Sequence, residues 1–481
     1  MATTPRAVSV QPPPRGPVSD WRSSRRFSSA SVCVRGTIAE SRKLKMANIE
    51  ARVLRGFRDY LPDVMLPRQR MLEVVSGVFE SFGFSPLSTP ALEYADVLVG
   101  KYGEEGEKLL YRFLDNGERD VALRYDLTVP LARLVDMNRD LVRPFKRYQI
   151  APVWRAETPG RGRFREFVQC DIDIVGSDSL MADAECLAVG ASVLEALGVS
   201  RFVLRINNTK LLTGLMHKIG VSSDAEQALL RTVDKLPKIG EARTRELLAT
   251  ESKLSASGVD AVFEFLRLKP EALDDYFVGN DVGLKGASEL RTVLALARDL
   301  GVSDKVEVDL SIARGLDYYT GTIYETFLLD LESIGSVMSG GRYDTLLAMF
   351  GGEALPAVGI SLGVDRLFSA LQELGLVVAK ASPTQVLVTV FDEGTRAASY
   401  AVAARLRQAG LNVEVFLGTG KLKKQFQYVD RKRIPFAVVS GPDELQRGEV
   451  TLKHMSSGEQ TTFVWQDEAG IVSLAERVRA G

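Results

Sequence analysis

Nine residues from Ala313 to Gly321 bring a guanidinium and two phenols together between two segments that predict strands. Arg314 could hold a carboxylate or a phosphate through two parallel hydrogen bonds. Tyr318 and Tyr319 could stack on a flat ligand and hydrogen-bond to it. The stretch predicts a ligand site, although a hairpin edge with ordinary surface residues would show the same pattern.

A carboxylate and a hydroxyl lie two residues apart in Asp126-Leu127-Thr128, directly after a predicted strand. In an extended chain both side chains would point to the same side, where they suit an ammonium group. Asp126 could equally supply the N-cap of the helix predicted to follow. The residues alone favour neither interpretation.

The segment from Arg155 to Asp173 predicts two strands joined by a glycine-containing loop with three arginines, Arg161, Arg163 and Arg165. The return strand carries an amide and two acids at alternate positions, Gln169, Asp171 and Asp173. Alternation places these three on one face, which must meet solvent or a polar pocket because burying it unpaired would be costly. Loop arginines suit a polyphosphate, and a solvent-facing hairpin is the alternative.

Arg366 follows Gly359 and Gly363, whose missing side chains would let a ligand approach the backbone closely. Taken singly, Arg366 would more often be a surface residue. Together the four segments predict an arginine-rich anion site with carboxylates and no histidine base. That chemistry suits attack by a carboxylate on an α-phosphate, because positive charge stabilises the transition state and an ionised carboxylate needs no general base.

Composition excludes several other chemistries. The 481 residues are 45% hydrophobic and 26% charged, as in soluble globular proteins, and the net charge of -1 confines any nucleic-acid contact to local patches. Three cysteines without CxxC spacing argue against a disulfide framework or a zinc site. Two distant histidines argue against a Ser-His-Asp triad, and no apolar run is long enough to predict a transmembrane helix.

The elements that must position these residues are strands and helices in mixed order. Extended segments are predicted at 121–125, 145–154, 165–175 and 306–310, while 207–300 reads as largely helical. Ser339 to Asp344 predicts a turn leading into a helix, and Gly359 to Phe368 a strand or turn feeding another helix.

A polar linker from Lys380 to Thr384 marks the clearest domain break. Beyond it, strands and helices alternate, which predicts a small α/β domain with a mostly parallel sheet. Its helix over 421–432 is basic and has two interleaved aromatic residues: Lys421, Lys423, Lys424, Phe426, Tyr428, Arg431, Lys432 and the following Arg433. Such a helix suits a single-stranded RNA loop, and a solvated helix face is the alternative.

Residues 1–45 are rich in Ser, Arg and Pro, and the first acidic residue is Asp20. No apolar h-region is present, so a secretory signal is not expected, whereas this composition is typical of an organellar transit peptide. A disordered tail without an address is the alternative. Initiation at Met46 would give an untargeted, cytoplasmic form.

On these residues the chain resembles the histidyl-tRNA synthetase family of class II aminoacyl-tRNA synthetases, from about residue 52 to the C-terminus. Phe82 to Pro90, Arg155 to Asp173 and Gly359 to Arg366 look like the three class II motifs. Arg314 with Leu316 to Tyr319, and Gly340 to Asp344, are similar to the two segments peculiar to the histidine enzymes. The stretches 123–130 and 163–171 look more like the eukaryotic branch of the family.

The resemblance implies a function and a fold. Histidine would be activated with ATP and joined to the 3' end of tRNA(His), with Mg²⁺ accompanying ATP. Residues 47–380, after the transit extension that composition predicts over 1–46, would be an α+β catalytic domain on a six-stranded antiparallel sheet flanked by helices. The insertion 207–300 would reach towards the acceptor stem, and 384–481 would bind the anticodon. Family members are homodimers, and no membrane association is implied.

The resemblance also implies site roles. Asp126, Leu127, Thr128 and Gln169 would surround the histidine α-ammonium, and Asp173 and Tyr319 would bracket the imidazole nitrogens. Tyr318 and Tyr343 would line that pocket. Arg155 and Arg314 would bind the α-phosphate beside histidine, with Arg366 against ATP and Arg163 nearer the tail phosphates. The tRNA contacts would fall to Lys421, Lys423, Lys424 and Arg431.

Two features depart from the commoner family pattern. Asp126 and Asp173 stand where the bacterial proteins have Glu, and the N-terminal extension has no counterpart in the core family. Alternatives within reach are a regulatory subunit of histidine biosynthesis, a tRNA-sensing domain of a kinase, and another class II synthetase. The retained arginines and C-terminal domain argue against the first, the missing kinase signature against the second, and Arg314 to Gly321 against the third.

Overall fold

The computed structural model describes residues 50–100, 106–313, 318–352, 354–377, 382–418 and 421–480. The predicted transit peptide, Met46 and Arg314 lie outside these ranges, as does part of the predicted linker.

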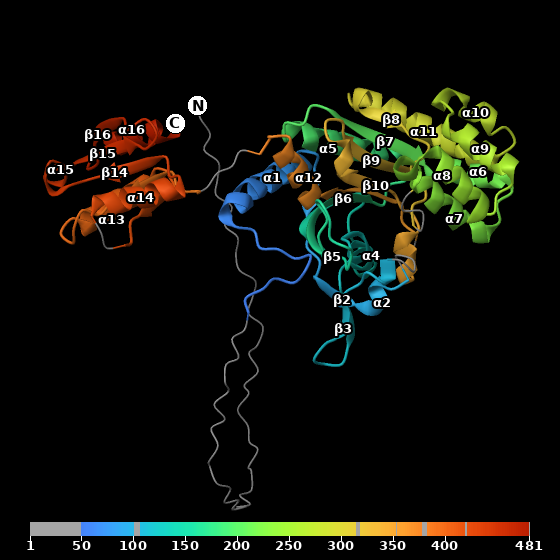
Figure 1. Ribbon diagram of the computed structural model, residues 1–481, viewed down its shortest axis with the longest axis horizontal. Helices are drawn as coiled ribbons and strands as arrows, with labels where there is room; N and C mark the ends of the chain where they lie inside the picture. The colour runs from blue at the N-terminus through green and yellow to red at the C-terminus, as the bar shows by residue number, and fades with distance from the viewer. Residues whose placement is uncertain are drawn as a thin grey trace, which may run out of the picture. The chain divides into compact units, whose positions relative to one another are not determined.

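The part of the chain predicted to be catalytic (residues 47–380, called the catalytic unit below) is built around an eight-stranded sheet (Figure 1). Its strands, in spatial order, are β1 (Ser85–Pro86), β5 (Phe145–Trp154), β6 (Glu166–Val175), β11 (Ala357–Gly363), β10 (Met338–Arg342), β9 (Thr322–Leu328), β7 (Phe202–Asn208) and β8 (Val306–Val308). The six inner strands all pair antiparallel. The edge strands β1 and β8 each pair parallel with their neighbour. The expected six-stranded antiparallel sheet is therefore present and is extended by one short parallel strand at each edge.

Helices with one apolar face pack against this sheet and against each other. Phe79 of α1 and Leu187 of α5 are buried in one core cluster with Ile172 of β6 and Ile360 of β11. The helices concerned are α1 (Pro62–Ser81), α5 (Leu180–Ala196), α11 (Asp281–Asp299) and α12 (Val364–Glu373). Because α12 begins directly after β11, the predicted strand-to-helix transition before Arg366 is confirmed.

A three-stranded sheet carries the Asp126 segment. Its order is β2 (Leu92–Tyr94), β4 (Asp120–Leu123), β3 (Arg112–Leu114), with α2 (Ala95–Leu98) after β2 and α4 (Thr128–Met137) after β4. By contrast, the prediction of a turn over Ser339 to Asp344 that leads into an α-helix is wrong. Strand β10 runs through Arg342, and a turn and a 3-10 helix (Leu346–Phe350) follow.

The helical insertion gathers at one end of the catalytic unit, in green to yellow in Figure 1. It contains α6 (Thr209–Ile219), α7 (Ser223–Asp234), α8 (Leu236–Thr250), α9 (Ala256–Leu266) and α10 (Leu273–Tyr276), ahead of α11. None of the helices in the described ranges combines the length and apolar character that a membrane crossing needs.

The C-terminal domain has its own sheet and core. The strands run in the order β13 (Val413–Val415), β12 (Val386–Val388), β14 (Phe436–Val439), β15 (Glu449–His454), β16 (Gln460–Val464). The first three pair parallel, as the strand and helix alternation predicts, whereas β15 and β16 add antiparallel pairs. The helices are α13 (Arg396–Gln408), α14 (Leu422–Lys432), α15 (Pro442–Gln446) and α16 (Glu468–Arg479).

Candidate active site

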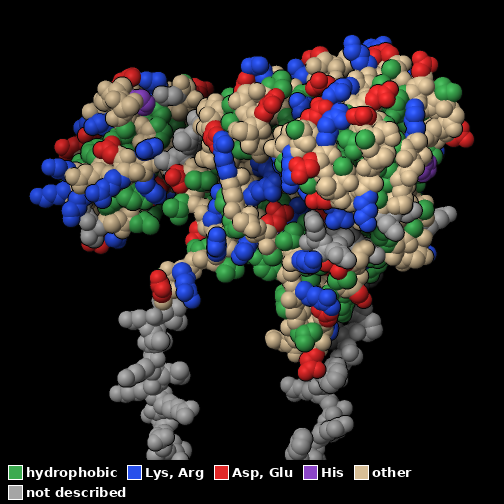
Figure 2. Space-filling view, turned by 45° about the vertical axis from the view of Figure 1, so that its right-hand side comes forward, with side chains coloured by type: hydrophobic (Ala, Val, Ile, Leu, Met, Phe, Trp, Pro, Cys, Tyr) green, Lys and Arg blue, Asp and Glu red, His purple; other side chains and the backbone are tan. Residues whose placement is uncertain are grey.

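A cavity in two joined parts lies over the inner strands of the large sheet. Arg155, Gln169, Ser339 and Ser361 line both parts. One part is rich in arginines and the other in carboxylates and phenols. Figure 2 shows Lys and Arg side chains gathered in a recess of the catalytic unit. A ligand spanning both parts would present an anionic group to one and cationic or hydrogen-bonding groups to the other.

Asp173 of β6 is the most constrained acid of the second part. The guanidinium of the fully buried Arg147 on β5 forms an ion pair with it, with Nη2 2.5 Å from Oδ2. The hydroxyl of Tyr343 donates to Oδ1. Burial raises the pKa of Asp173 to about 6, and Arg147 opposes this rise. A Cβ on Gly359, directly opposite in β11, would lie 2.1 Å from Oδ1.

Gly359 therefore makes room for the Asp173 carboxylate. It also lines the second part of the cavity, and its admission of a ligand to the backbone stays a prediction. Strand packing also requires glycine at position 341, because a Cβ there would lie 2.6 Å from the carbonyl oxygen of Thr322. Its neighbour Arg342 is buried in an ion pair with Asp183 of α5. The Gly340 to Asp344 segment thus holds the sheet together and presents Tyr343 to the cavity.

Three tyrosine rings stand beside Asp173. The rings of Tyr318 and Tyr319 have centroids 4.6 Å apart, and that of Tyr343 is 6.3 Å from Tyr318. Burial raises the pKa of each phenol, so all three remain protonated at neutral pH and can donate a hydrogen bond. A flat ring held here would meet both aromatic faces and phenolic donors.

Asp126 supports the start of α4 from just before its N-cap residue, Leu127, and its binding of an ammonium group stays a prediction. Its Oδ1 accepts hydrogen bonds from the backbone N–H groups of Thr128 (3.2 Å) and Val129 (3.1 Å) at the start of α4. The carboxylate also lines the cavity, as does Thr128. Leu127 is fully buried, and its carbonyl oxygen accepts a hydrogen bond from Arg147. The helix start thereby fixes a negative charge at the cavity wall.

Gln169 meets two residues to which sequence reasoning gave no site role. Its Nε2 donates to Oγ of Ser361 at 2.7 Å, and Ser361 in turn donates to Oδ1 of Asp171. Asp171 could have been found from its alternation with Gln169 and Asp173, whereas nothing in the local sequence marks Ser361. Burial raises the pKa of Asp171 to about 7, opposed by Arg147.

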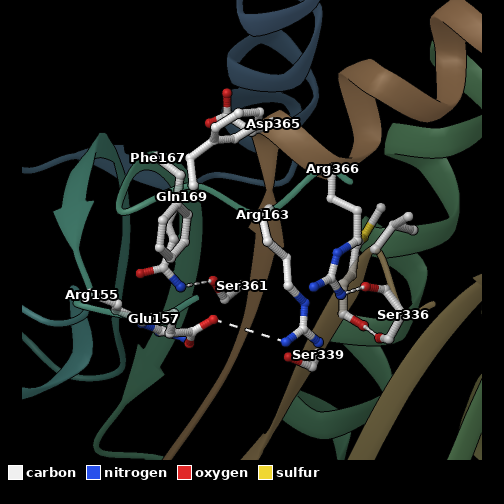
Figure 3. Close-up of a pocket in the computed structure, with 15 residues that line it drawn as sticks. Arg155, Glu157, Arg163, Phe167, Gln169, Ser336, Ser339, Ser361, Asp365 and Arg366 are labelled. Carbon is white, nitrogen blue, oxygen red and sulfur yellow. Dashed lines mark hydrogen bonds and ion pairs between the residues drawn. The ribbon is translucent and has the colours of Figure 1, made fainter. Parts of the chain in front are cut away.

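Arginines line the first part of the cavity (Figure 3). Arg155 donates from Nε to the carbonyl oxygen of Tyr125 (3.1 Å), and Arg366 donates to that of Ser336 (2.5 Å). Arg163 is half exposed on the loop, with Nη1 3.9 Å from a Glu157 carboxylate oxygen. The structure therefore brings together three of the predicted phosphate-binding arginines, and the fourth, Arg314, lies outside the described residues.

A buried acid next to Arg366 was missed from the sequence. Asp365 accepts hydrogen bonds from Arg58 (2.5 Å), Arg68 (3.1 Å), the Tyr60 hydroxyl and the backbone N–H of Val168 (3.0 Å). The Arg58 guanidinium also lies 3.6 Å from the ring centroid of Phe164, in the arginine-rich loop. About 300 residues separate Arg58 from Asp365, so no local pattern reveals the pair.

The basic helix of the C-terminal domain is α14. Its exposed positions include Lys421, Lys423, Lys424 and Arg431, the four predicted RNA contacts. Figure 2 shows Lys and Arg side chains gathered at one edge of this domain. Its aromatics differ from the expectation: Phe426 and Tyr428 are partly buried against a small apolar cluster, and Tyr428 donates to Glu414. They therefore support the fold of the helix more than they offer free stacking surfaces.

Comparisons with known proteins cover nearly all of the described chain. A family model described as "Histidyl-tRNA synthetase" matches residues 56–367, and one described as "Anticodon binding domain" matches 385–473. The "Histidine--tRNA ligase" of Wolinella succinogenes is 46% identical over 440 residues, 89% of this chain and 99% of the relative. That of Rhodopirellula baltica is 42% identical over 429 residues, 88% of this chain and 97% of the relative.

A solved histidyl-tRNA synthetase from Nostoc sp. PCC 7120 superimposes with a TM-score of 0.80 at 36% identity, covering 90% of this chain and 99% of the other. A structure described as an "ATP phosphoribosyltransferase regulatory subunit/histidyl-tRNA synthetase" from Bacillus halodurans C has a TM-score of 0.65 at 22% identity, covering 78% and 95%. The second likeness concerns the fold alone.

Proposed function

Because this chain belongs to the histidyl-tRNA synthetase family, we propose that it is a histidine–tRNA ligase. It would condense L-histidine with ATP to histidyl-adenylate and diphosphate, and then transfer histidine to the 3' end of tRNA(His). The observation that carries this proposal is the two-part cavity, in which a carboxylate and phenol pocket joins an arginine-lined cleft at Arg155 and Gln169.

The histidine pocket would bind both the α-ammonium group and the imidazole ring of the amino acid. Asp126, Thr128 and Gln169 hold the α-ammonium group, and Leu127 packs behind them. Asp173 accepts from one imidazole nitrogen and Tyr319 hydrogen-bonds to the other, while Tyr318 and Tyr343 enclose the ring. An apolar analogue would leave these buried polar groups unpaired, so the pocket would discriminate strongly against it.

Adenylation needs two anions to meet in line, and the arginines supply the opposing charge. Arg155 and Arg314 act on the α-phosphate, Arg366 lies against ATP, and Arg163 faces the β- and γ-phosphates. Arg155 is already held by the carbonyl oxygen of Tyr125 and lies 4.2 Å from the Tyr125 ring, so little reorganisation is needed when the phosphate binds.

Mg²⁺ would enter with ATP. No group of three or more metal-ligating side chains is assembled within the described ranges. Magnesium usually takes one or two carboxylates together with substrate phosphates. Glu157 offers such a carboxylate in the arginine-lined cleft, whereas Asp365 is already occupied by its arginines. This donor set fits an ion carried by the nucleotide.

We divide the chain into a catalytic domain over 47–380 and an anticodon-binding domain over 384–481. Their separate sheets and cores support this division. Lys421, Lys423, Lys424 and Arg431 would contact tRNA phosphates, and the insertion over 207–300 would approach the acceptor stem.

The active form would be a homodimer. Exposed apolar side chains at the start of α1, along it and on the three-stranded sheet support this proposal, because a monomer would leave them in water: Leu61, Met65, Val74, Tyr94, Phe113 and Leu114. Light scattering on the purified protein should give twice the chain mass, and a monomer mass at micromolar concentration would contradict it.

We also propose that the protein acts in mitochondria or plastids. The support is the Ser- and Arg-rich composition of residues 1–46 and the eukaryotic-like stretches 123–130 and 163–171. The relatives described above are bacterial, so they do not bear on this point. A fluorescent reporter fused to residues 1–46 should enter an organelle, and a diffuse cytosolic signal would refute the proposed targeting.

Histidine-dependent ATP–diphosphate exchange, measured against each of the other amino acids, tests the activity itself. Exchange with histidine alone is expected, and its absence would overturn the assignment in favour of histidine binding without activation. Arg314→Ala should lose exchange while still binding tRNA, and unchanged exchange would remove Arg314 from the chemistry.

A further inference from the structure

The side-chain amide of Gln169 is held in one orientation by a relay across two strands. Ser361 of β11 lies opposite Asp171 of β6 in the sheet register. The Ser361 hydroxyl donates its single proton to Oδ1 of Asp171. That hydroxyl therefore has only lone pairs left for Gln169, which must present its Nε2 donor, and it does so at 2.7 Å.

Gln169 lines both parts of the cavity, and the other end of its amide is the carbonyl oxygen Oε1. Gln169 is buried, and its Oε1 has no hydrogen-bond partner among the described residues. A buried carbonyl oxygen without a donor costs free energy comparable to a lost hydrogen bond, which a bound ligand can recover. Because Nε2 is committed to Ser361, an incoming donor meets the oxygen and never the NH₂ group.

We propose that Asp171 and Ser361 are positioning residues that fix the Gln169 amide so that its carbonyl oxygen receives the substrate's α-ammonium group. The inference rests on the proposed binding of histidine in this pocket. It gives a role to Ser361, which nothing in the local sequence marks, and to Asp171, which the sequence places only on the polar face of its strand.

The direction of the relay depends on an ionised Asp171, which can only accept. Burial raises its pKa to about 7, as does the neighbouring charge of Asp173, and the guanidinium of Arg147 on β5 opposes the rise. At pH 8 the carboxylate is ionised. If Asp171 were protonated, it could donate to Ser361, Ser361 could donate to Gln169, and the amide could turn its NH₂ towards the ammonium.

Ser361→Ala in the full-length chain, assayed by ATP–diphosphate exchange at pH 8, tests the relay. Loss of a hydrogen bond to a charged group predicts a KM for histidine that rises about tenfold. The KM for ATP should stay unchanged. The inhibition constant of 3-(imidazol-4-yl)propanoate, which lacks the α-amino group, should also stay unchanged. Ser361→Thr keeps the hydroxyl and should restore the KM for histidine.

Ser369→Ala is the matched control, because Ser369 is also a partly buried serine that donates a hydrogen bond, here to the backbone carbonyl oxygen of Asp365, but itself lines neither part of the cavity. An unchanged KM for histidine in Ser361→Ala would overturn the relay. So would a variant that binds histidine and 3-(imidazol-4-yl)propanoate more weakly by the same factor. Asp171→Ala, which removes the acceptor of the Ser361 proton, should weaken histidine binding in the same selective way. If the wild-type protein showed no exchange with histidine, the proposed function itself would fail, which is a separate outcome.

Discussion

Gly359→Ala offers the sharpest test of how the histidine pocket is built. The added Cβ would lie 2.1 Å from Oδ1 of Asp173, and ordinary contacts begin near 3.4 Å, so the carboxylate must retreat by about 1.3 Å. The carbonyl oxygen of Ile172, 2.5 Å from the same Cβ, blocks relief by a backbone shift. The Tyr343 hydrogen bond and the Arg147 ion pair would both be distorted.

Two magnitudes follow. Overpacking of this kind costs about 1–3 kcal/mol of folding free energy. A hydrogen bond between a charged carboxylate and the imidazole N–H is worth about 1.5–3 kcal/mol. At about 1.36 kcal/mol per tenfold change, the KM for histidine should rise about 10- to 150-fold. The KM for ATP should change little, because Arg163 and Arg366 line the other part of the cavity.

Diphosphate exchange gives the two KM values, and urea denaturation gives the free energy of unfolding. Gly363→Ala, on the same strand, is the control for stability because its nearest neighbour is a carbonyl oxygen 3.9 Å from the added Cβ. A Gly359→Ala protein with wild-type KM for histidine and wild-type stability would refute the argument that Gly359 exists to seat Asp173.

Three further outcomes are expected. Burial raises the pKa of Asp171 from 3.8 to about 7, so ionisation of Asp171 in the folded protein lowers the wild-type free energy of unfolding as pH rises between these values. Asp171→Asn does not ionise, and its free energy of unfolding relative to the wild type should therefore increase by up to about 4 kcal/mol from pH 4 to pH 8. A difference between the two proteins that does not change with pH would contradict this. Asp365→Asn leaves the buried Arg68 without a charge partner, so the free energy of unfolding measured in urea should fall by about 3 kcal/mol and the KM for ATP should rise. Wild-type stability and a wild-type KM for ATP would show that the ion pairs of Asp365 are unimportant. Lys423→Ala with Lys424→Ala should raise the KM for tRNA and flatten its salt dependence without altering exchange, and an unchanged salt slope would remove α14 from the interface.

Local patterns predicted the strands and helices that carry the site, because alternation and helical spacing are properties of neighbouring residues. Gln169, Asp171 and Asp173 line the same cavity, as their spacing indicates, and Asp126 accepts hydrogen bonds from the first N–H groups of a helix. What escaped prediction depends on which strands lie opposite one another. The register of β6 against β11 decides that Gly359 seats Asp173 and that Ser361 meets Asp171.

Burial of charge also escaped prediction. Arg147 sits among other polar residues of a strand and gives no local sign that it is fully buried beside Asp173. Arg342, which sits within a family-specific segment, is a structural ion-pair partner of Asp183. In both cases the compensating acid lies on another element, and only the tertiary structure identifies it.

The link between Arg58 and Asp365 sets a limit on how far the amino terminus can be trimmed. Arg58, Tyr60 and Arg68 converge on a carboxylate that adjoins the ATP cleft. A product starting at Met46 keeps all three, whereas proteolysis beyond Arg58 would remove part of the wall behind the nucleotide. Any amino-terminal cleavage that preserves activity is therefore expected to fall before this arginine, and N-terminal sequencing of active preparations should always include it.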